Sequence, residues 1–452
     1  MALNRNERSS IKACAVYSDM GKLQDDIDNG LWDKSKYAII YVENLAYIYT
    51  VDNFASSMVT DDYDIKDSTN ITHKAKKTYL NNGLNKVNCA YLDEWFKNSF
   101  KPAPPIHILN YFAFSALEDS NISLSSNIIG NNTNELYESI VLEYSKDKTS
   151  WELWNYNHTP IYLQANETVY IRGNNPHGLG NMNTETGIGI AYSFSNSTGK
   201  FNVHGNIMSL LYNDDFSDKI CIPTPYCFYE LFTSCNIISA ADLILPATIL
   251  TERCYGNMFA NCSNLLGVPE LPAITLQNMC YSGMFMNCLK LMNVPELPAT
   301  TLADYCYSFM FYGCESLLNT SELLASTLAD GCYLEMFGSC VNLINAPKLS
   351  ASILKNECYS GMFNGCINLT NAPDLPAPNL VYNCYSYMFY GCTNLNYIKI
   401  MATNADTNIN ECTDSWTHNV SSNGIFVKHP NMTLFVKGED GIPNGWTVNN
   451  SY

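Results

Sequence analysis

The chain has 452 residues, 46% of them hydrophobic and 15% charged, so it is long and apolar enough for several folded domains with buried cores. Its formal net charge of −18 and the lack of a Lys/Arg stripe exclude a broad electrostatic grip on nucleic acid. The longest apolar stretch, "YAIIYV" from Tyr37, is far shorter than the roughly 20 residues that span a bilayer. No apolar run of about seven residues follows the first charges, so we expect no secretory signal, no membrane insertion and synthesis in the cytosol.

Residues 1–103 have the pattern of a mixed α/β domain. We expect helices over 19–30, 72–80 and 91–100, and extended chain over 37–51. The proline-rich "KPAPP" from Lys101 cannot continue a helix and is typical of a linker, so a domain boundary is expected there.

Residues 106–218 contain short alternating stretches separated by Asn, Gly and Ser turns. Examples are "SIVLEYS", "PIYLQA", "ETVYIRG" and "IGIAYSFS". Alternation of this kind predicts half-buried strands, and several of them in succession favour a β-sandwich domain.

A 26-residue repeat fills residues 221–400. It begins with two cysteines eight residues apart, as in "CYSGMFMNC" from Cys280, and its copies start at Cys254, Cys280, Cys306, Cys332, Cys358 and Cys384. A looser copy, "CFYELFTSC", starts at Cys227. If the first cysteine is position 0, the apolar residues lie at 0, +1, +4, +5 and +8, which predicts one face of a two-turn helix.

The rest of each copy predicts a bend and a short strand. A leucine lies three residues after the second cysteine, and a "VPELPA"-like segment follows, which suits a strand of two or three residues in a parallel stack. One bend position repeats Asn, whose amide can satisfy backbone groups, and another repeats Ala, which predicts close packing. No copy can bury its apolar face alone, so the copies must stack, at about 4.8 Å per coil, into a rod roughly 30 Å long. The Asn positions are Asn293, Asn319, Asn345 and Asn371, and the Ala positions are Ala273, Ala299, Ala325, Ala351 and Ala377.

The unit "CYxxMFxxCxxLxxxPxLPAxxL" resembles the cysteine-rich BspA-type leucine-rich repeats of Bacteroidales surface proteins and of the crAss-like phages that infect these bacteria. The resemblance covers residues 221–400 and implies a leucine-rich-repeat α/β solenoid of about seven coils. Residues 401–452 resemble the β cap of such arrays. The expected fold class is therefore α+β and multidomain: an N-terminal docking domain (1–103), a β-sandwich (106–218), the solenoid (221–400) and the cap (401–452).

The cysteine spacing separates three interpretations of the thiols. Within one copy, two cysteines eight residues apart on a helix are too distant for a disulfide, although pairing between coils stays open. No CxxC occurs and no His lies near a Cys pair at ligand spacing, so we expect neither a metal site nor a cofactor. The favoured interpretation is buried, reduced thiols that act as small hydrophobic side chains.

Catalytic motifs are missing from the sequence, and an enzyme is not expected. Two surface features are instead candidate sites. A charged column, Glu270, Glu296, Glu322, Lys348 and Asp374, serves either solubility or the binding of a cation or another ligand. The aromatic residues Phe309, Tyr312, Tyr387 and Tyr390 fall outside the apolar stripe, where they anchor a protein or glycan partner or pack on neighbouring segments.

The resemblance implies a non-enzymatic structural and adhesive component of a phage virion, a head or tail fibre assembled in the host cytoplasm. Residues 1–103 would dock on capsid or tail proteins, and the array would contact a host surface protein or glycan. We expect a homo-oligomer, with trimer preferred over dimer. The alternative is a bacterial cell-surface leucine-rich-repeat adhesin, which would need an export signal.

Overall fold

The computed structural model describes residues 109–129, 140–156, 159–183, 188–405, 408–433 and 435–450, and the backbone of six strands before them. The chain forms two compact units, Met1–Ile108 and Leu109–Tyr452. Strands dominate the described residues. Their helices, α4 (Ser209–Tyr212) and α5 (Ile409–Cys412), have only four residues each.

The described part of the first unit is a six-stranded sheet with the order β1-β2-β3-β6-β5-β4. The extended chain expected over 37–51 is confirmed by β2 and β3, which pair antiparallel. The helix expected over 72–80 is wrong, because this segment is β5, and its hydrogen bonds to strands on both sides outweigh the helix propensity of its Lys and Ala residues. The helices expected over 19–30 and 91–100 lie outside the described residues. The strands are β1 (Cys14–Tyr17), β2 (Ala38–Val42), β3 (Leu45–Tyr49), β4 (Asp62–Lys66), β5 (Thr72–Tyr79) and β6 (Leu84–Asn88).

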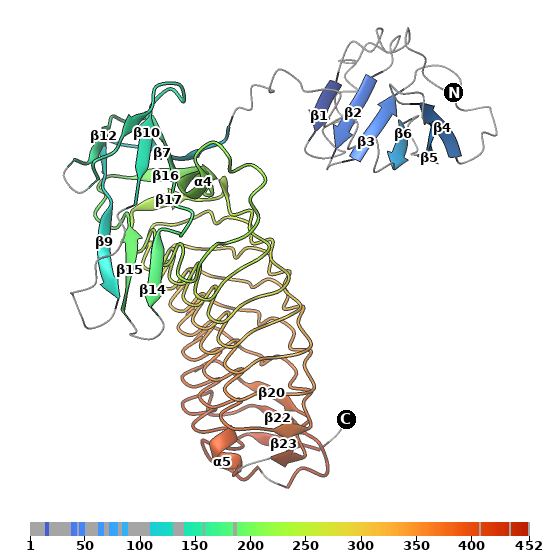
Figure 1. Ribbon diagram of the computed structural model, residues 1–452. Helices are drawn as coiled ribbons and strands as arrows, with labels where there is room; N and C mark the ends of the chain where they lie inside the picture. Colours follow the sequence, from blue (N-terminus) through green and yellow to red (C-terminus); the bar gives the residue numbers. More distant parts are fainter. Residues whose placement is uncertain are drawn as a thin grey trace. The chain divides into compact units, whose positions relative to one another are not determined.

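The second unit begins with three sheets (Figure 1). The largest has the order β11-β10-β13-β7-β16-β17, with β18 also paired to β16; β12 pairs with β8, and β14-β15-β9 form the third. The strands are β7 (Phe112–Ala116), β8 (Ser120–Ile122), β9 (Ser125–Ile129), β10 (Leu142–Ser145), β11 (Glu152–Leu153), β12 (Ile161–Leu163), β13 (Thr168–Gly173), β14 (Gly180–Asn183), β15 (Ile188–Ser193), β16 (Phe201–Asn206), β17 (Ile237–Ser239) and β18 (Leu243–Ile244).

Aromatic side chains join the largest sheet to the third. Phe114 on β7 contacts Phe194, directly after β15, with ring centroids 4.8 Å apart, and Phe112 also contacts Phe194. All three rings are fully buried. Edge-to-face and tilted pairs of this kind add to the energy of area burial, so they fix the sheets against each other.

The repeat copies lie one on the next as stacked coils (Figure 1). In the coil that begins at Cys254, the N–H groups of Tyr255, Asn257 and Phe259 donate to carbonyls of the next coil. The alternate N–H groups, such as that of Met258, donate three residues back and close tight turns. Half of the backbone donors in this segment therefore bind along the stack, and half bind locally.

The helix expected at positions 0 to +8 is wrong, because the segment is a run of turns. Every fourth residue has positive φ, for example Arg253 (52°), Asn257 (52°) and Asn261 (60°). Each left-handed residue donates its own N–H to the neighbouring coil, as Asn257 does to Ser282, and the N–H that follows donates three residues back instead of four. A chain with a period of 4.0 residues per turn also buries the side chains at positions 0, +1, +4, +5 and +8. A segment of eight residues is too short to distinguish this period from the 3.6 residues per turn of an α-helix.

The expected strand in each coil is also wrong for most copies. The "ELPA" segments of the middle coils have no strand, and only isolated parallel bridges, such as Thr275 to Thr301, join neighbouring copies. The prolines of this segment lack the N–H that a continuous ladder needs. The close packing expected at the repeated alanines is confirmed, since each is at most 4% exposed.

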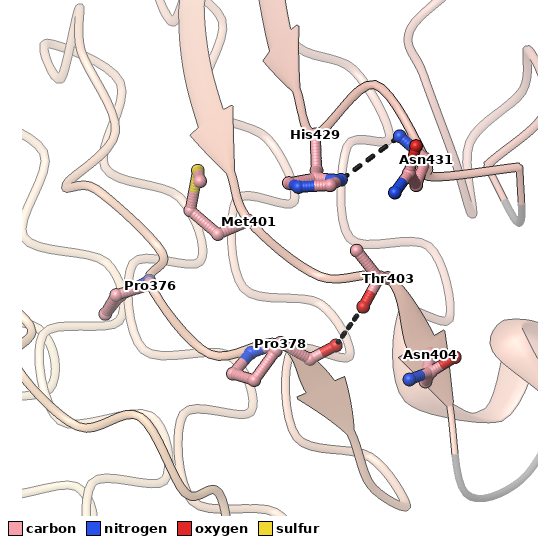
Figure 2. A pocket seen from close by; sticks show the side chains of 7 residues that line it. All are labelled: Pro376, Pro378, Met401, Thr403, Asn404, His429 and Asn431. Atoms are coloured by element: carbon pink, nitrogen blue, oxygen red, sulfur yellow. Dashed lines mark hydrogen bonds between the residues drawn. The ribbon is translucent and has the colours of Figure 1, made fainter. Parts of the chain in front are cut away.

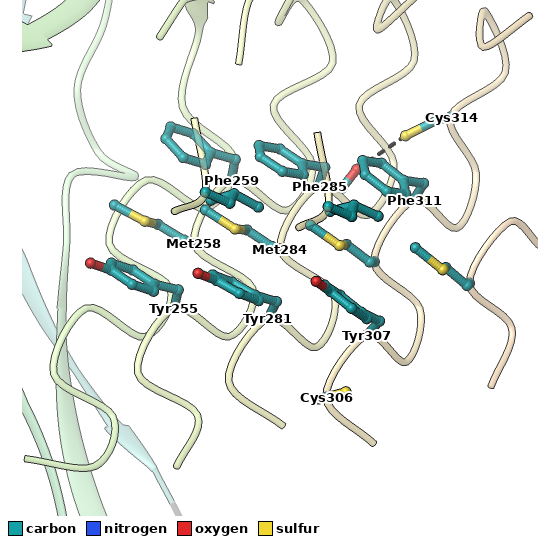
Figure 3. Packing of buried hydrophobic residues seen from close by; sticks show 14 of the residues in the cluster. Tyr255, Met258, Phe259, Tyr281, Met284, Phe285, Cys306, Tyr307, Phe311 and Cys314 are labelled. Atoms are coloured by element: carbon teal, nitrogen blue, oxygen red, sulfur yellow. Dashed lines mark hydrogen bonds between the residues drawn. The ribbon is translucent and has the colours of Figure 1, made fainter. Parts of the chain in front are cut away.

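The core of the stack consists of continuous columns of identical side chains (Figure 3). Rings at position +1 run from Phe228 to Tyr385 with centroids 5.8–6.0 Å apart, and rings at +5 run from Phe232 to Phe389 at 5.2–6.0 Å. Methionines at +4 are fully buried, as are the leucines at +11. Each coil therefore buries its apolar face only against its two neighbours.

The upper end of the stack is covered by residues that take the place of a further coil. Gly180 and Phe194 donate their N–H groups to the carbonyls of Cys227 and Leu231, the same kind of acceptors that each coil offers to the coil before it. The Phe194 ring stacks on Phe232 at 5.7 Å and so extends the column at +5. Strand β16 also pairs parallel with β17 and β18 of the first copy. The three sheets and the coils thus share one hydrophobic core.

The lower end of the stack is covered by Trp416. Its indole lies at the methionine position and contacts Tyr385 at 6.3 Å and Phe389 at 6.1 Å. Its Nε1–H donates to the carbonyl of Gly441 at 2.9 Å, and buried Thr413 and Thr417 bond to the same covering loop. The remaining strands are β19 (Asn379–Leu380), paired with β21 (Asn404–Ala405), and the parallel sheet β20 (Tyr397–Ile400), β22 (Ile425–Lys428) and β23 (Thr447–Asn449).

Candidate functional site

The cysteines of the coils are free thiols, and all from Cys227 to Cys412 are buried, as the sequence predicts, whereas Cys221 is exposed. The thiols at position +8 have a further role that the sequence interpretation missed. From Cys262 to Cys392, each donates to the carbonyl at +5 of the preceding coil at 3.0–3.2 Å, as Cys314 does to Phe285. These thiols are therefore hydrogen-bond donors as well as small apolar side chains.

Burial also determines the reactivity of these thiols. It raises the pKa of Cys254, Cys262 and Cys314 to about 12, because a thiolate would lose its hydration. The protonated thiol is neither a nucleophile nor a metal ligand. Across the part of the chain that the structure describes, no group of three or more His, Cys, Asp or Glu residues is placed to hold a metal ion. No described helix has both the length and the apolar character that crossing a bilayer requires.

The four predicted aromatic residues form two pairs on the outward side of the turn segments. Phe309 and Tyr312 have ring centroids 6.0 Å apart and are half-buried. Tyr387 and Tyr390 have centroids 5.9 Å apart and are 41% and 37% exposed. The two pairs belong to coils separated by three steps of the stack, so the structure brings together the members of each pair but not all four residues.

Further aromatic residues share these coils. Tyr305 lies at position −1 beside the first pair, and Tyr382, 45% exposed, lies at −2 beside the second. His418 stacks on Tyr390 with centroids 4.8 Å apart. The repeat frame could have identified Tyr305 and Tyr382, because at these outward positions the six regular coils that start at Cys254 to Cys384 otherwise carry only non-aromatic residues. His418 belongs to the cap, where the 26-residue frame ends.

The charged column has the exposure expected of a solvated surface. Glu270, Glu296, Glu322, Lys348 and Asp374 are all exposed. Asp374 forms an ion pair with Lys399 at 2.6 Å, which partly neutralises that end of the column. The neighbouring Asn positions do not bind backbone as predicted. The Asn345 amide instead donates to the Asn319 side chain of the preceding coil at 3.0 Å.

A hollow of about 700 Å³ lies beside the last coil and the cap (Figure 2). Pro376, Pro378, Met401, Thr403, Asn404, His429 and Asn431 line it. The Thr403 hydroxyl faces the Pro378 carbonyl at 3.5 Å, and His429 Nδ1 accepts from the Asn431 N–H at 3.1 Å. Its described lining has one imidazole, that of His429, and no carboxylate, Lys or Arg.

Taken together, these features define a sheet-rich protein in which a repeated cysteine and aromatic pattern builds a stack of coils. Comparison with protein-family models, curated proteins and solved structures found no match to the chain.

Proposed function

We propose that the protein is a non-enzymatic, adhesive component of a phage virion, in which the coil stack projects from the particle as part of a fibre. On this proposal the stacked coils are a leucine-rich-repeat solenoid whose helices are replaced by turns. Residues 106–218 are a β-sandwich, and residues 1–103 dock on capsid or tail proteins. The resemblance of the repeat to BspA-type sequences of Bacteroidales and their phages motivates the proposal.

One observation carries the mechanical part of the proposal: the ring columns at +1 and +5 run without a break through the stack. Bending the stack would separate rings on one side, and every such pair adds about 0.5–1.5 kcal/mol beyond its area burial. A stack with both ends covered, by Phe194 and by Trp416, resists bending and end-to-end growth. Stiffness and a free lateral surface suit a spacer that presents binding residues away from a particle.

Several copies of such a spacer would act together. A homo-oligomer multiplies weak lateral contacts into avidity, so we propose a symmetric assembly, with a trimer preferred over a dimer. The lateral contact would be made to a host surface protein or glycan through Phe309, Tyr312, Tyr387 and Tyr390.

Immunogold labelling tests the location. An antibody raised against residues 221–400 should label purified phage particles at a fixed position on the head or tail. Pre-absorbing the antibody with the purified protein should remove the label. Label on bacterial cells but not on particles would overturn the virion proposal in favour of a cell-surface adhesin.

A further inference from the structure

Surface aromatic residues are confined to particular coils at a regular interval. Positions −2, −1, +2, +3, +6 and +7 lie outside the inward-facing stripe. In the coils that begin at Cys254, Cys280, Cys332 and Cys358, none of these positions is aromatic. The coil of Cys306 carries Tyr305, Phe309 and Tyr312, here called the first belt, and the coil of Cys384 carries Tyr382, Tyr387 and Tyr390, the second belt.

The belts are three coils apart, about 14 Å at about 4.8 Å per coil. Tyr229 in the copy of Cys227 lies one further interval of three coils before the first belt, is half-buried, and occupies position +2, which neither belt uses. The aromatic residues therefore have a longer period than the repeat that carries them. Core packing does not require this period, because every coil has the same inward residues.

Three of these aromatic residues have a backbone conformation that opposes bulky side chains. Tyr305, Phe309 and Tyr387 have φ of 54°, 56° and 57°, in the left-handed region. Other coils have either glycine at the corresponding positions, as at Gly331 and Gly361, or polar residues such as Asn257. Large rings at left-handed positions that point outward add nothing to the inward core, which indicates a role other than folding.

Neighbouring residues hold the rings of both belts in place. The Tyr305 hydroxyl donates to Glu357 at 3.0 Å, and the Tyr305 and Tyr312 rings lie over Gly331 and Gly338 of the next coil, where a side chain would clash. In the second belt, Tyr390 stacks on His418, whose Nδ1 is 2.8 Å from a carboxylate oxygen of Glu439. Rings that are ordered before binding lose little conformational freedom when a ligand arrives.

The charges around the belts limit the ligand. From the first belt to the second, the outward positions include Asp304, Asp330, Glu335 and Glu357 but no Lys or Arg. Acidic polymers would be repelled here. Glu335 Oε2 is buried and inaccessible to a ligand, so the accessible acceptors are exposed carboxylates such as that of Asp304. Carboxylate oxygens beside flat aromatic surfaces suit a ligand with many hydroxyl groups and no negative charge.

We propose that the two belts bind one linear, neutral polysaccharide laid along the coil stack, an inference that rests on the adhesive function proposed above. Sugar rings stack on the tyrosine and phenylalanine faces, and exposed carboxylates beside the belts, such as that of Asp304, accept hydrogen bonds from the hydroxyl groups. A linear polymer can contact both belts, three coils apart, at the same time, which one compact epitope would not require.

The test uses the full-length protein in native gels that contain dextran, mannan or galactan, with acidic polygalacturonate as the charged comparison. We expect at least one neutral polymer to retard the protein and polygalacturonate to have no effect. The first belt is removed by Tyr305→Gly, Phe309→Gly and Tyr312→Asn, and the second by Tyr382→Asn, Tyr387→Gly and Tyr390→Asn. Other coils carry these replacement residues at the same positions, so the variants should fold, which circular dichroism checks.

Removal of either belt should weaken the apparent affinity for the long polymer by ten- to a hundredfold, because the second contact is then lost. For a short oligosaccharide of the same sugar, removal of one belt should halve the number of binding sites per chain that calorimetry measures. A control variant, Glu270→Gln, Glu296→Gln and Glu322→Gln on the charged column, should bind as the unaltered protein does. The inference would be overturned if no neutral polymer retarded the protein, or if the belt variants were retarded as strongly as the unaltered protein. Sedimentation showing that the belts only join two copies of the chain would also overturn it.

Failure of this inference is distinguishable from failure of the proposed function. If gold labels the particles but no polymer binds, the fibre proposal stands and the polysaccharide inference is rejected. If the protein binds polymer but is found on cells and not on particles, the polysaccharide inference stands and the virion proposal is rejected.

Discussion

The Sγ atom of Cys314 lies 3.2 Å from the carbonyl oxygen of Phe285 in the preceding coil. The same oxygen also accepts the N–H of Cys288, three residues on in its own coil. One carbonyl thus ends a local turn and joins two coils. The repeated second cysteine therefore supplies a second donor to a carbonyl that already accepts a backbone N–H (Figure 3).

This relationship predicts different outcomes for two small substitutions. Cys314→Ala removes both the donor and part of the packing and should lower the free energy of unfolding by about 1–3 kcal/mol. Cys314→Ser keeps a donor and should lower it less, in urea unfolding at pH 7. If the serine variant is as unstable as the alanine variant or worse, the thiol acts through packing alone.

Alkaline pH should destabilise the coils. Burial raises the pKa of Cys262, Cys306 and Cys314 to about 12, above the value of about 8.5 for an exposed thiol. Below about pH 8 these thiols are protonated in both states and contribute no pH dependence. From pH 9 upward the unfolded chain loses protons that the folded chain keeps, so the free energy of unfolding falls as pH rises toward 12.

Urea midpoints at pH 7, 8, 9 and 10 measure this effect. We expect little change from pH 7 to 8 and a clear fall from pH 9 to 10. Each thiol replaced by serine should reduce the slope by up to about 1.4 kcal/mol per pH unit. The same slope in a Cys262→Ser, Cys314→Ser double variant and in the unaltered protein would contradict the prediction.

The left-handed residues predict opposite effects for two substitutions at position +7. Gly391 has φ of 72°, and the nearest atom to an added Cβ would be Gly365 Cα at 3.7 Å, so Gly391→Ala strains the backbone without a clash. It should cost about 1 kcal/mol or slightly more. Ser339, with φ of 58°, should gain a similar amount on change to glycine. Thermal unfolding of both variants checks the pair, and a stabilising Gly391→Ala would refute a left-handed period of four.

Trp416 should control the stability of the last coils. Trp416→Ala removes a fully buried ring that covers Tyr385 and Phe389, and should cost about 3–5 kcal/mol. Because each coil contacts only its neighbours, amide hydrogen exchange should accelerate most over residues 384–450 and little near Cys254. Trp416→Phe, which keeps a ring but loses the bond to Gly441, should have an intermediate effect. Uniform acceleration along the stack would contradict nearest-neighbour stability.

Local sequence patterns explain much of the coil interior. The period of the apolar residues correctly identified which side chains are buried, from Cys280 to Cys288, and the repeated alanines correctly indicated close packing. The same pattern wrongly predicted helices. Over eight residues, periods of 3.6 and 4.0 select the same positions, although the recurrent Gly, Asn and Ser at +7 are a sign of left-handed backbone.

The predicted site was recovered only in part for a related reason. Phe309, Tyr312, Tyr387 and Tyr390 were recognisable because they lie outside the inward stripe. Their grouping with Tyr305 and Tyr382 depends on which turn positions point outward, and the stacking of His418 on Tyr390 depends on where the cap chain returns. Neither is encoded within one 26-residue copy.

By itself the sequence determined the length of the repeat, its inward side chains and the need to stack, because burial of an apolar face follows from local periodicity. The tertiary structure decided where the backbone hydrogen bonds go. An N–H such as that of Phe259 can donate within its own segment or to Met284 in the next coil, and only the presence of that coil selects the second acceptor. The tertiary structure also decided how the two ends of the stack are covered. Phe194 and Trp416 each lie where the side chains of one further coil would pack.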